Sequence, residues 1–131
     1  MRMLLAALLS CVVSSALAVE FKPFPRERVS EQQWNAYHDE VKTAYGASAQ
    51  EVKEVNLVTY SGGSMSFAFT RPAHAAHPAW IVRRIVEREG KMFVDQIGYF
   101  AGAEEPFAQL FRQYQALNKR MIEELERRQK K

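Results

Sequence analysis

A long apolar stripe near the carboxyl end of the chain constrains the fold more than any other feature. Large apolar residues recur there at steps of three and four, the spacing that places side chains on one face of an α-helix: Phe107, Leu110, Phe111, Tyr114, Leu117, Met121 and Leu125. Pro106 suits the first turn of such a helix, and Glu104 and Glu105 place negative charge at its amino end. Burial of each large side chain contributes about 1.5–3 kcal/mol, so we expect this helix to pack against an apolar surface.

A sheet between residues 52 and 100 is the surface that this helix can cover. Alternation of apolar residues with small or polar ones is clearest in Met65–Thr70 and indicates a β-strand. Apolar and β-branched residues predict three further strands, over residues 52–60, 80–88 and 91–100. The connections are a glycine turn at residues 61–64, a proline-containing loop at 71–78 and a tight turn at 89–90. Such short connections predict a four-stranded antiparallel meander.

A second helix is predicted over residues 31–45, before the sheet. Ser30 and Gln33 form the pattern of a capping box, in which each side chain binds a backbone N–H at the start of a helix. Apolar residues then follow at helical spacing: Trp34, Tyr37, Val41 and Tyr45. Gly46 is a natural end for this helix, because glycine adopts the left-handed conformation easily.

These elements predict a single α+β domain over residues 30–131, in the order helix, four antiparallel strands and long helix. Because an antiparallel sheet commonly hides one face and leaves the other wet, we expect both helices to cover the same face. The opposite face would then present polar strand residues to solvent: Ser64, Ser66, Thr70, Arg83 and Glu87. Residues 19–29 contain two prolines and are predicted to form an extended arm.

Residues 1–18 have the pattern of a cleaved signal peptide. The cationic start at Arg2, the apolar run up to Val13 and the small residues at 16–18 predict cleavage before Val19. A membrane span needs about 20 apolar residues, so no transmembrane segment is expected after cleavage. A lipid anchor on Cys11 is the alternative, and mass spectrometry of the exported protein distinguishes the two. The predicted location is the bacterial periplasm or the extracellular space.

The composition of the mature chain excludes several classes of chemistry. Loss of 18 of the 131 residues leaves 113, the size of one domain. Cys11 is the only cysteine, so the mature chain has no disulfide and no thiolate for zinc binding, nucleophilic attack or redox chemistry. No phosphate-binding glycine loop is present, and the aromatic residues follow a core pattern. Neither a cofactor nor a nucleic-acid partner is therefore predicted.

The three histidines are the strongest candidates for chemistry. His74 and His77 lie three positions apart in a loop, and His38 on the first helix could complete a metal site or a hydrolase-type centre. Spacing on a loop does not force imidazole rings to converge. The metal or enzyme interpretation therefore requires all three rings to share one pocket.

Asp95 is a carboxylate within an otherwise apolar strand pattern. Because an unpaired buried charge is costly, we expect Asp95 to pair with Arg83 or Arg84 rather than to act in catalysis. The sequence contains no Gly-x-Ser-x-Gly motif, the strand-to-helix turn that carries the nucleophilic serine of many hydrolases. The sequence therefore favours a protein that is not an enzyme.

The function predicted from these observations is that of a small exported domain that binds a protein or an envelope component. The candidate contact residues belong to the aromatic arm, to the third strand and to the basic carboxyl end: Phe21, Phe24, Arg83, Arg84, Arg127 and Arg128. A homodimer through the carboxyl-terminal helix is a further hypothesis, because Leu110 and Leu117 recur at a seven-residue interval typical of a coiled-coil seam.

Overall fold

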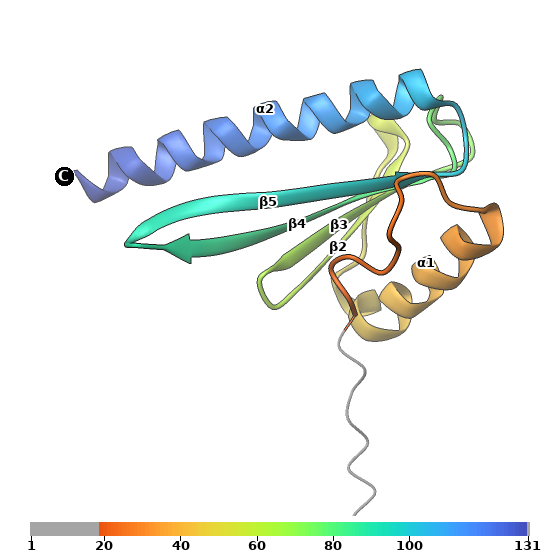
Figure 1. Cartoon of the computed structure of the whole chain (residues 1–131), viewed down its shortest axis with the longest axis horizontal. Coiled ribbons are helices and arrows are strands. Elements are labelled where there is room, and N and C mark those ends of the chain that lie inside the picture. The colour runs from red at the N-terminus through yellow and green to blue at the C-terminus, as the bar shows by residue number, and fades with distance from the viewer. Residues whose placement is uncertain (1–18, 131) are drawn as a thin grey trace, which may run out of the picture.

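The computed structural model describes residues 19–130, so the predicted signal segment, residues 1–18, lies outside the described part. Helix α1 (Glu31–Tyr45) precedes an antiparallel sheet, and the long helix α2 (Glu104–Gln129) follows it (Figure 1). The strands lie in sequence order in the sheet: β1 (Gln50–Val52), β2 (Leu57–Gly62), β3 (Met65–Thr70), β4 (Ala79–Arg88) and β5 (Lys91–Phe100). The predicted α+β class and both predicted helices are confirmed.

The sheet has five strands, whereas the sequence predicted four. The segment predicted as a single strand over residues 52–60 is broken by a 3-10 turn at Lys53–Val55. Asn56 follows this turn with a left-handed backbone at φ 54°, a conformation that asparagine tolerates better than most residues. The chain therefore reverses, and Gln50–Val52 pairs antiparallel with the start of β2.

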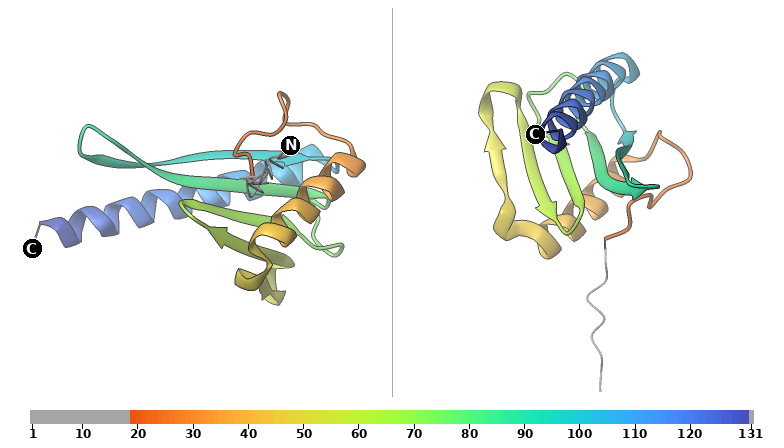
Figure 2. Two further views of the ribbon diagram at one scale, coloured as in Figure 1. Left: turned by 90° about the horizontal axis from the view of Figure 1, so that it is seen from below. Right: turned by 90° about the vertical axis from the view of Figure 1, so that its left-hand side faces the viewer.

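The two helices cover opposite faces of the sheet, as the right-hand view of Figure 2 shows. The expectation that both helices cover one face is therefore wrong. The reason lies in β4, where the consecutive residues 79–82 are all apolar and all buried. Such a run is typical of a strand that is buried on both faces. Of the residues expected to face solvent, Thr70 is 1% exposed and Arg83 binds α2, while Ser64, Ser66 and Glu87 remain at least partly accessible.

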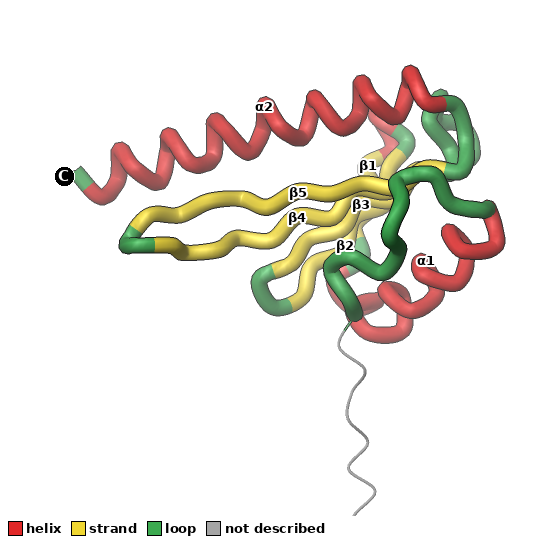
Figure 3. The backbone as a smooth tube through the Cα atoms, in the orientation of Figure 1, coloured by secondary structure: helices red, strands yellow, loops and turns green. Residues whose placement is uncertain are grey.

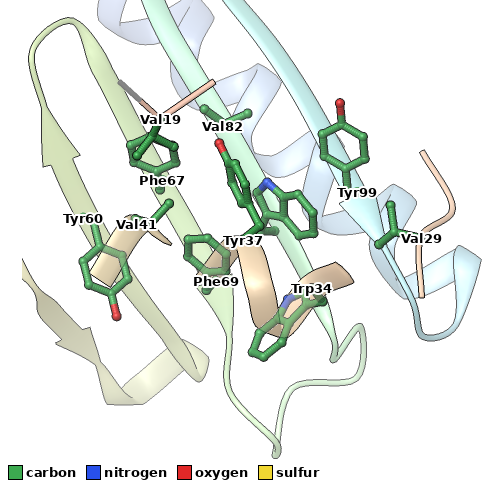
Figure 4. Close-up of a cluster of buried hydrophobic side chains, with 11 residues drawn as sticks. Val19, Val29, Trp34, Tyr37, Val41, Tyr60, Phe67, Phe69, Val82 and Tyr99 are labelled. Atoms are coloured by element: carbon green, nitrogen blue, oxygen red, sulfur yellow. The ribbon is translucent and has the colours of Figure 1, made fainter. Parts of the chain in front are cut away.

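The larger core lies between α1 and the sheet, and most of its large side chains are aromatic (Figure 4). Tyr37 stacks on Trp80 with ring centroids 4.8 Å apart, and the Trp34 indole donates a hydrogen bond to the carbonyl oxygen of Ala79 at 3.1 Å. The predicted capping box is present at the start of this helix, with both hydrogen bonds formed between Ser30 and Gln33. The capping box thus sets the first turn, and the aromatic stripe fixes which face turns inward.

A smaller core lies between α2 and the opposite face. Phe107 stacks on Phe100 with centroids 4.6 Å apart. Gly98 permits this approach, because a Cβ atom at this position would lie 2.8 Å from the Phe107 ring. Farther along the helix, Asn118 accepts a hydrogen bond from Arg83 at 2.8 Å and donates one to Gln96 at 2.6 Å. Apolar packing near the start of α2 thus gives way to a polar network near its middle.

The predicted arm is folded onto the domain. Glu27 and Val29 form backbone hydrogen bonds with Phe100 at 2.9 and 3.0 Å, and the Tyr99 hydroxyl donates to the Phe24 carbonyl at 2.7 Å. The Tyr37 hydroxyl donates a hydrogen bond to the Glu20 carbonyl oxygen, which places this part of the arm beside α1. No helix within residues 19–130 has the length and apolar character needed to cross a membrane.

Candidate functional site

A groove of 920 Å³ lies between the arm and the outer side of α1. Its walls come from two segments that the Tyr37 hydroxyl ties together, because it donates a hydrogen bond to the Glu20 carbonyl oxygen at 2.6 Å. Burial raises the pKa of Tyr37, so this hydroxyl remains a donor throughout the ordinary pH range. The lining residues are Val19, Glu20, Pro23, Phe24, Ala36, Tyr37, Asp39, Glu40, Thr43 and Ala44.

The groove combines an apolar floor with an acidic rim. Glu20, Asp39 and Glu40 line it with exposed side chains, and none of the lining residues is Lys, Arg or His. The other lining residues are mostly apolar and small or aromatic, among them Phe24, Ala36 and Ala44. A groove of this kind can accept an apolar segment flanked by positive charge, because the fixed carboxylates favour cations and disfavour anions.

A second hollow, of 350 Å³, lies on the other side of α1 and contains two of the three histidines. His38 and His77 both line it, and the centroid of the Trp34 ring lies 5.0 Å from that of each imidazole. His74 does not line this hollow, and its Nδ1 instead accepts a hydrogen bond from the Ala76 backbone N–H at 2.9 Å. The structure therefore brings together two of the three predicted ligands and not the third.

His38 is uncharged at neutral pH. Burial, reinforced by the nearby positive charge of Lys42, lowers its pKa from 6.5 to about 4. The ring stacks on Phe69 at 4.1 Å, and its Nε2 forms a hydrogen bond with the Tyr60 hydroxyl at 3.0 Å. The packing of this ring makes it part of the core as well as of the hollow.

His77 is held by Thr70 through one ring nitrogen. Its Nδ1 lies 3.1 Å from the Thr70 carbonyl oxygen and 2.9 Å from the Thr70 hydroxyl. Because a carbonyl oxygen only accepts, Nδ1 is the donor in the first of these contacts. Within residues 19–130, no group of three histidine, aspartate or glutamate side chains is arranged to hold a metal ion. The hollow can therefore offer hydrogen bonds to a small polar molecule.

Four of the six predicted contact residues, those in the arm and in β4, pack against other elements of the domain. Phe21 lies beneath the Arg84 guanidinium, 4.1 Å from it, and Phe24 packs edge-on against Tyr99 at 5.7 Å. Arg83 lies 4.8 Å from the ring of Tyr114, in addition to its hydrogen bond with α2. Phe24 also lines the acidic groove.

The remaining predicted residues lie in exposed ion pairs. Arg127 and Arg128 are exposed near the end of α2 and pair with Glu124 at 2.8 and 3.5 Å. Asp95 pairs with Arg84 at 3.5 Å, which confirms its predicted pairing, and also with Arg88 at 3.1 Å. Asp95 on β5 therefore forms ion pairs with two residues of β4 and links the two strands of the hairpin.

The sequence did not reveal the acidic groove, because its carboxylates come from two segments that meet only after the arm folds back. Comparison with known protein families, curated proteins and solved structures finds no match for this chain. The interpretation of function therefore depends on the geometry described above.

Proposed function

We propose that this protein is a small exported, non-enzymatic domain that binds another protein through the groove between the arm and α1. The observation that carries the proposal is the acidic rim on an apolar floor, formed by Glu20, Asp39 and Glu40 without a basic neighbour in the lining. The partner segment that fits is apolar and positively charged, since electrostatic complementarity selects partners and accelerates their encounter.

Export is part of the proposal, and it is supported by the pattern of residues 1–18. Cleavage before Val19 would create a new amino terminus beside the groove, because Val19 lines it. This terminus would add one positive charge to three carboxylates, so the rim would remain net negative. Amino-terminal sequencing of the exported protein tests the step. The expected first residue is Val19, whereas an intact Met1 or a lipid on Cys11 would contradict it.

Binding to the groove can be tested with a short fluorescein-labelled peptide that alternates lysine and leucine. We expect binding at low ionic strength that weakens as salt is added, because the rim charges are exposed to screening. Replacing Glu20→Lys and Glu40→Lys together should weaken binding by about tenfold. The matched control is Glu123→Lys, which reverses an exposed carboxylate on α2, far along the sequence from the groove.

Three outcomes of this titration contradict the groove proposal. They are no binding at low salt, equal weakening by the control variant, and unchanged binding in the double variant. Vesicles of anionic lipid provide a second probe. Binding to vesicles that depends on Arg127 and Arg128 rather than on the groove would favour an envelope component as the partner.

A second candidate is the metal or hydrolase interpretation, reduced to His38 and His77 because His74 does not line their hollow. It is supported by the shared hollow of His38 and His77. Titration of the protein with zinc, followed by bound-metal analysis, tests it. One zinc per chain that is lost in His77→Ala would establish this candidate, and no zinc at that stoichiometry removes it.

A further inference from the structure

Strand β5 forms one border of the sheet, at the end of the strand order (Figure 2). The arm bonds to this border only at Phe100, through the Phe100 N–H and carbonyl. Because successive residues of a strand alternate in hydrogen-bonding direction, the backbone groups of Met92, Val94 and Gln96 also point outward. Within residues 19–130, no segment outside the sheet forms backbone hydrogen bonds with this part of β5.

The exposed part of the border belongs to a hairpin that extends beyond the rest of the sheet. Figure 3 shows the β4–β5 hairpin reaching well past the turn between β2 and β3. Phe93 is 42% exposed there, and Ile85 on the neighbouring strand is 39% exposed. A long edge strand with exposed apolar residues is a template for pairing with another strand.

The sequence of this edge, Lys91-Met92-Phe93-Val94-Asp95, is complementary to itself when two copies run antiparallel. A two-fold axis at Phe93 places Phe93 opposite Phe93, Met92 opposite Val94, and Lys91 opposite Asp95. In this register the outward-facing Met92 and Val94 become hydrogen-bonded pairs, as an antiparallel ladder requires. Aromatic pairs and pairs of opposite charge are among the cross-strand pairs that stabilise sheets.

We infer that this chain forms a two-fold symmetric homodimer by antiparallel pairing of the β5 edges around Phe93. The occupant of the edge is a second copy of the same chain, and the two sheets join into one. This surface is distinct from the groove of the proposed function and does not depend on it.

The neighbouring strand β4 extends the same complementarity. Val86 pairs with Phe93 within the hairpin, so the dimer would align an apolar row from Val86 through both Phe93 rings to Val86 of the second copy. Arg84 pairs with Asp95, so Lys91 of the second copy would place a positive charge on the other side of this carboxylate.

Neighbouring registers lack this match. Pairing around Asp95 would oppose two like charges, which is destabilising in a sheet. Pairing around Val94 would place Phe93 opposite Asp95, which leaves the aromatic ring beside a carboxylate. The residues of the edge therefore favour the register centred on Phe93.

Light scattering across a range of protein concentrations tests the dimer. We expect a dimer mass at about 200 µM that dissociates on dilution, because the paired surface is small. Val94→Pro removes an outward N–H that has no bonding role in the single chain, and proline is tolerated at such edge positions. Val94→Thr keeps this N–H and the branched side chain, so it should remain a dimer while Val94→Pro becomes a monomer.

A charge variant keeps the inference testable if the proline variant does not fold. Lys91→Glu would oppose a carboxylate to Asp95 of the second copy, so we expect at least a tenfold loss of dimer affinity. Lys53→Glu, which is remote from the edge, should leave the affinity unchanged.

In a Cys11→Ser background, Phe93→Cys should form an intermolecular disulfide under mild oxidation, and Leu117→Cys on α2 should not. A monomer at every concentration overturns the inference. So does a dimer unaffected by these edge variants, and crosslinking through Leu117→Cys would instead indicate pairing through α2.

Discussion

Mild acid will destabilise the protein through His38, whose ring is 8% exposed. Above pH 6.5 the ring is neutral in both the folded and the unfolded chain. Between pH 6.5 and about 4 the unfolded chain binds the proton and the folded chain does not, so the free energy of unfolding falls as the pH falls. A shift from 6.5 to about 4 corresponds to about 3 kcal/mol at full effect. Solvent in the adjoining hollow screens part of this effect, so we expect the free energy of unfolding to fall by about 1–2 kcal/mol.

The variant His38→Phe tests this reasoning because it keeps an aromatic ring against Phe69 and removes the titrating group. Urea unfolding followed by tryptophan fluorescence at pH 7, 6, 5 and 4 gives the dependence of the free energy of unfolding on pH. We expect the variant to lose less stability between pH 6.5 and 4 than the natural protein. His74→Ala is a comparison rather than a control, because burial lowers the pKa of this half-buried ring also, outside the aromatic core. Identical pH dependence in His38→Phe and the natural protein would refute the argument.

Two further variants test the packing of α2 on the sheet. Gly98→Ala should lower the free energy of unfolding by about 1–3 kcal/mol, because its Cβ would press on the Phe107 ring; thermal unfolding measures this, and an unchanged melting temperature contradicts the close approach. Asn118→Ala should cost about 1–3 kcal/mol because Arg83 loses its acceptor. Asn118→Asp keeps this acceptor but loses the N–H group that Gln96 accepts, so it should recover only part of the loss. An Asn118→Ala variant as stable as the natural protein would show that this network does not contribute.

Local signals in the sequence predicted the helices well. Ser30 and Gln33 fixed the start of α1, and the observed bounds Glu31–Tyr45 match the prediction. A capping box acts within one turn, so it can be seen without knowledge of the tertiary fold. The break before β2 was missed, because Asn56 in a left-handed conformation gives only a weak local signal.

Features that depend on distant contacts could not be predicted in the same way. The helices can cover opposite faces of the sheet because β4 is apolar on both faces. The alternation of apolar and polar residues in β3 instead suggested a sheet with one buried face. The pairing of Asp95 was predictable because Arg84 is its cross-strand neighbour, which follows from the hairpin. The acidic groove depends on how residues 19–24 fold back beside α1, and proline-rich extended segments carry little information on where they dock.

The central claim is that the groove between the arm and α1 is the binding surface. Hydrogen–deuterium exchange with and without the bound lysine–leucine peptide tests it directly, because it locates protection along the chain. We predict slower exchange in residues 19–24 and 36–44, which form the walls of the groove, with no change along α2. Protection confined to α2 or to the hollow that contains His38 and His77, with residues 19–24 and 36–44 unaffected, would contradict the account.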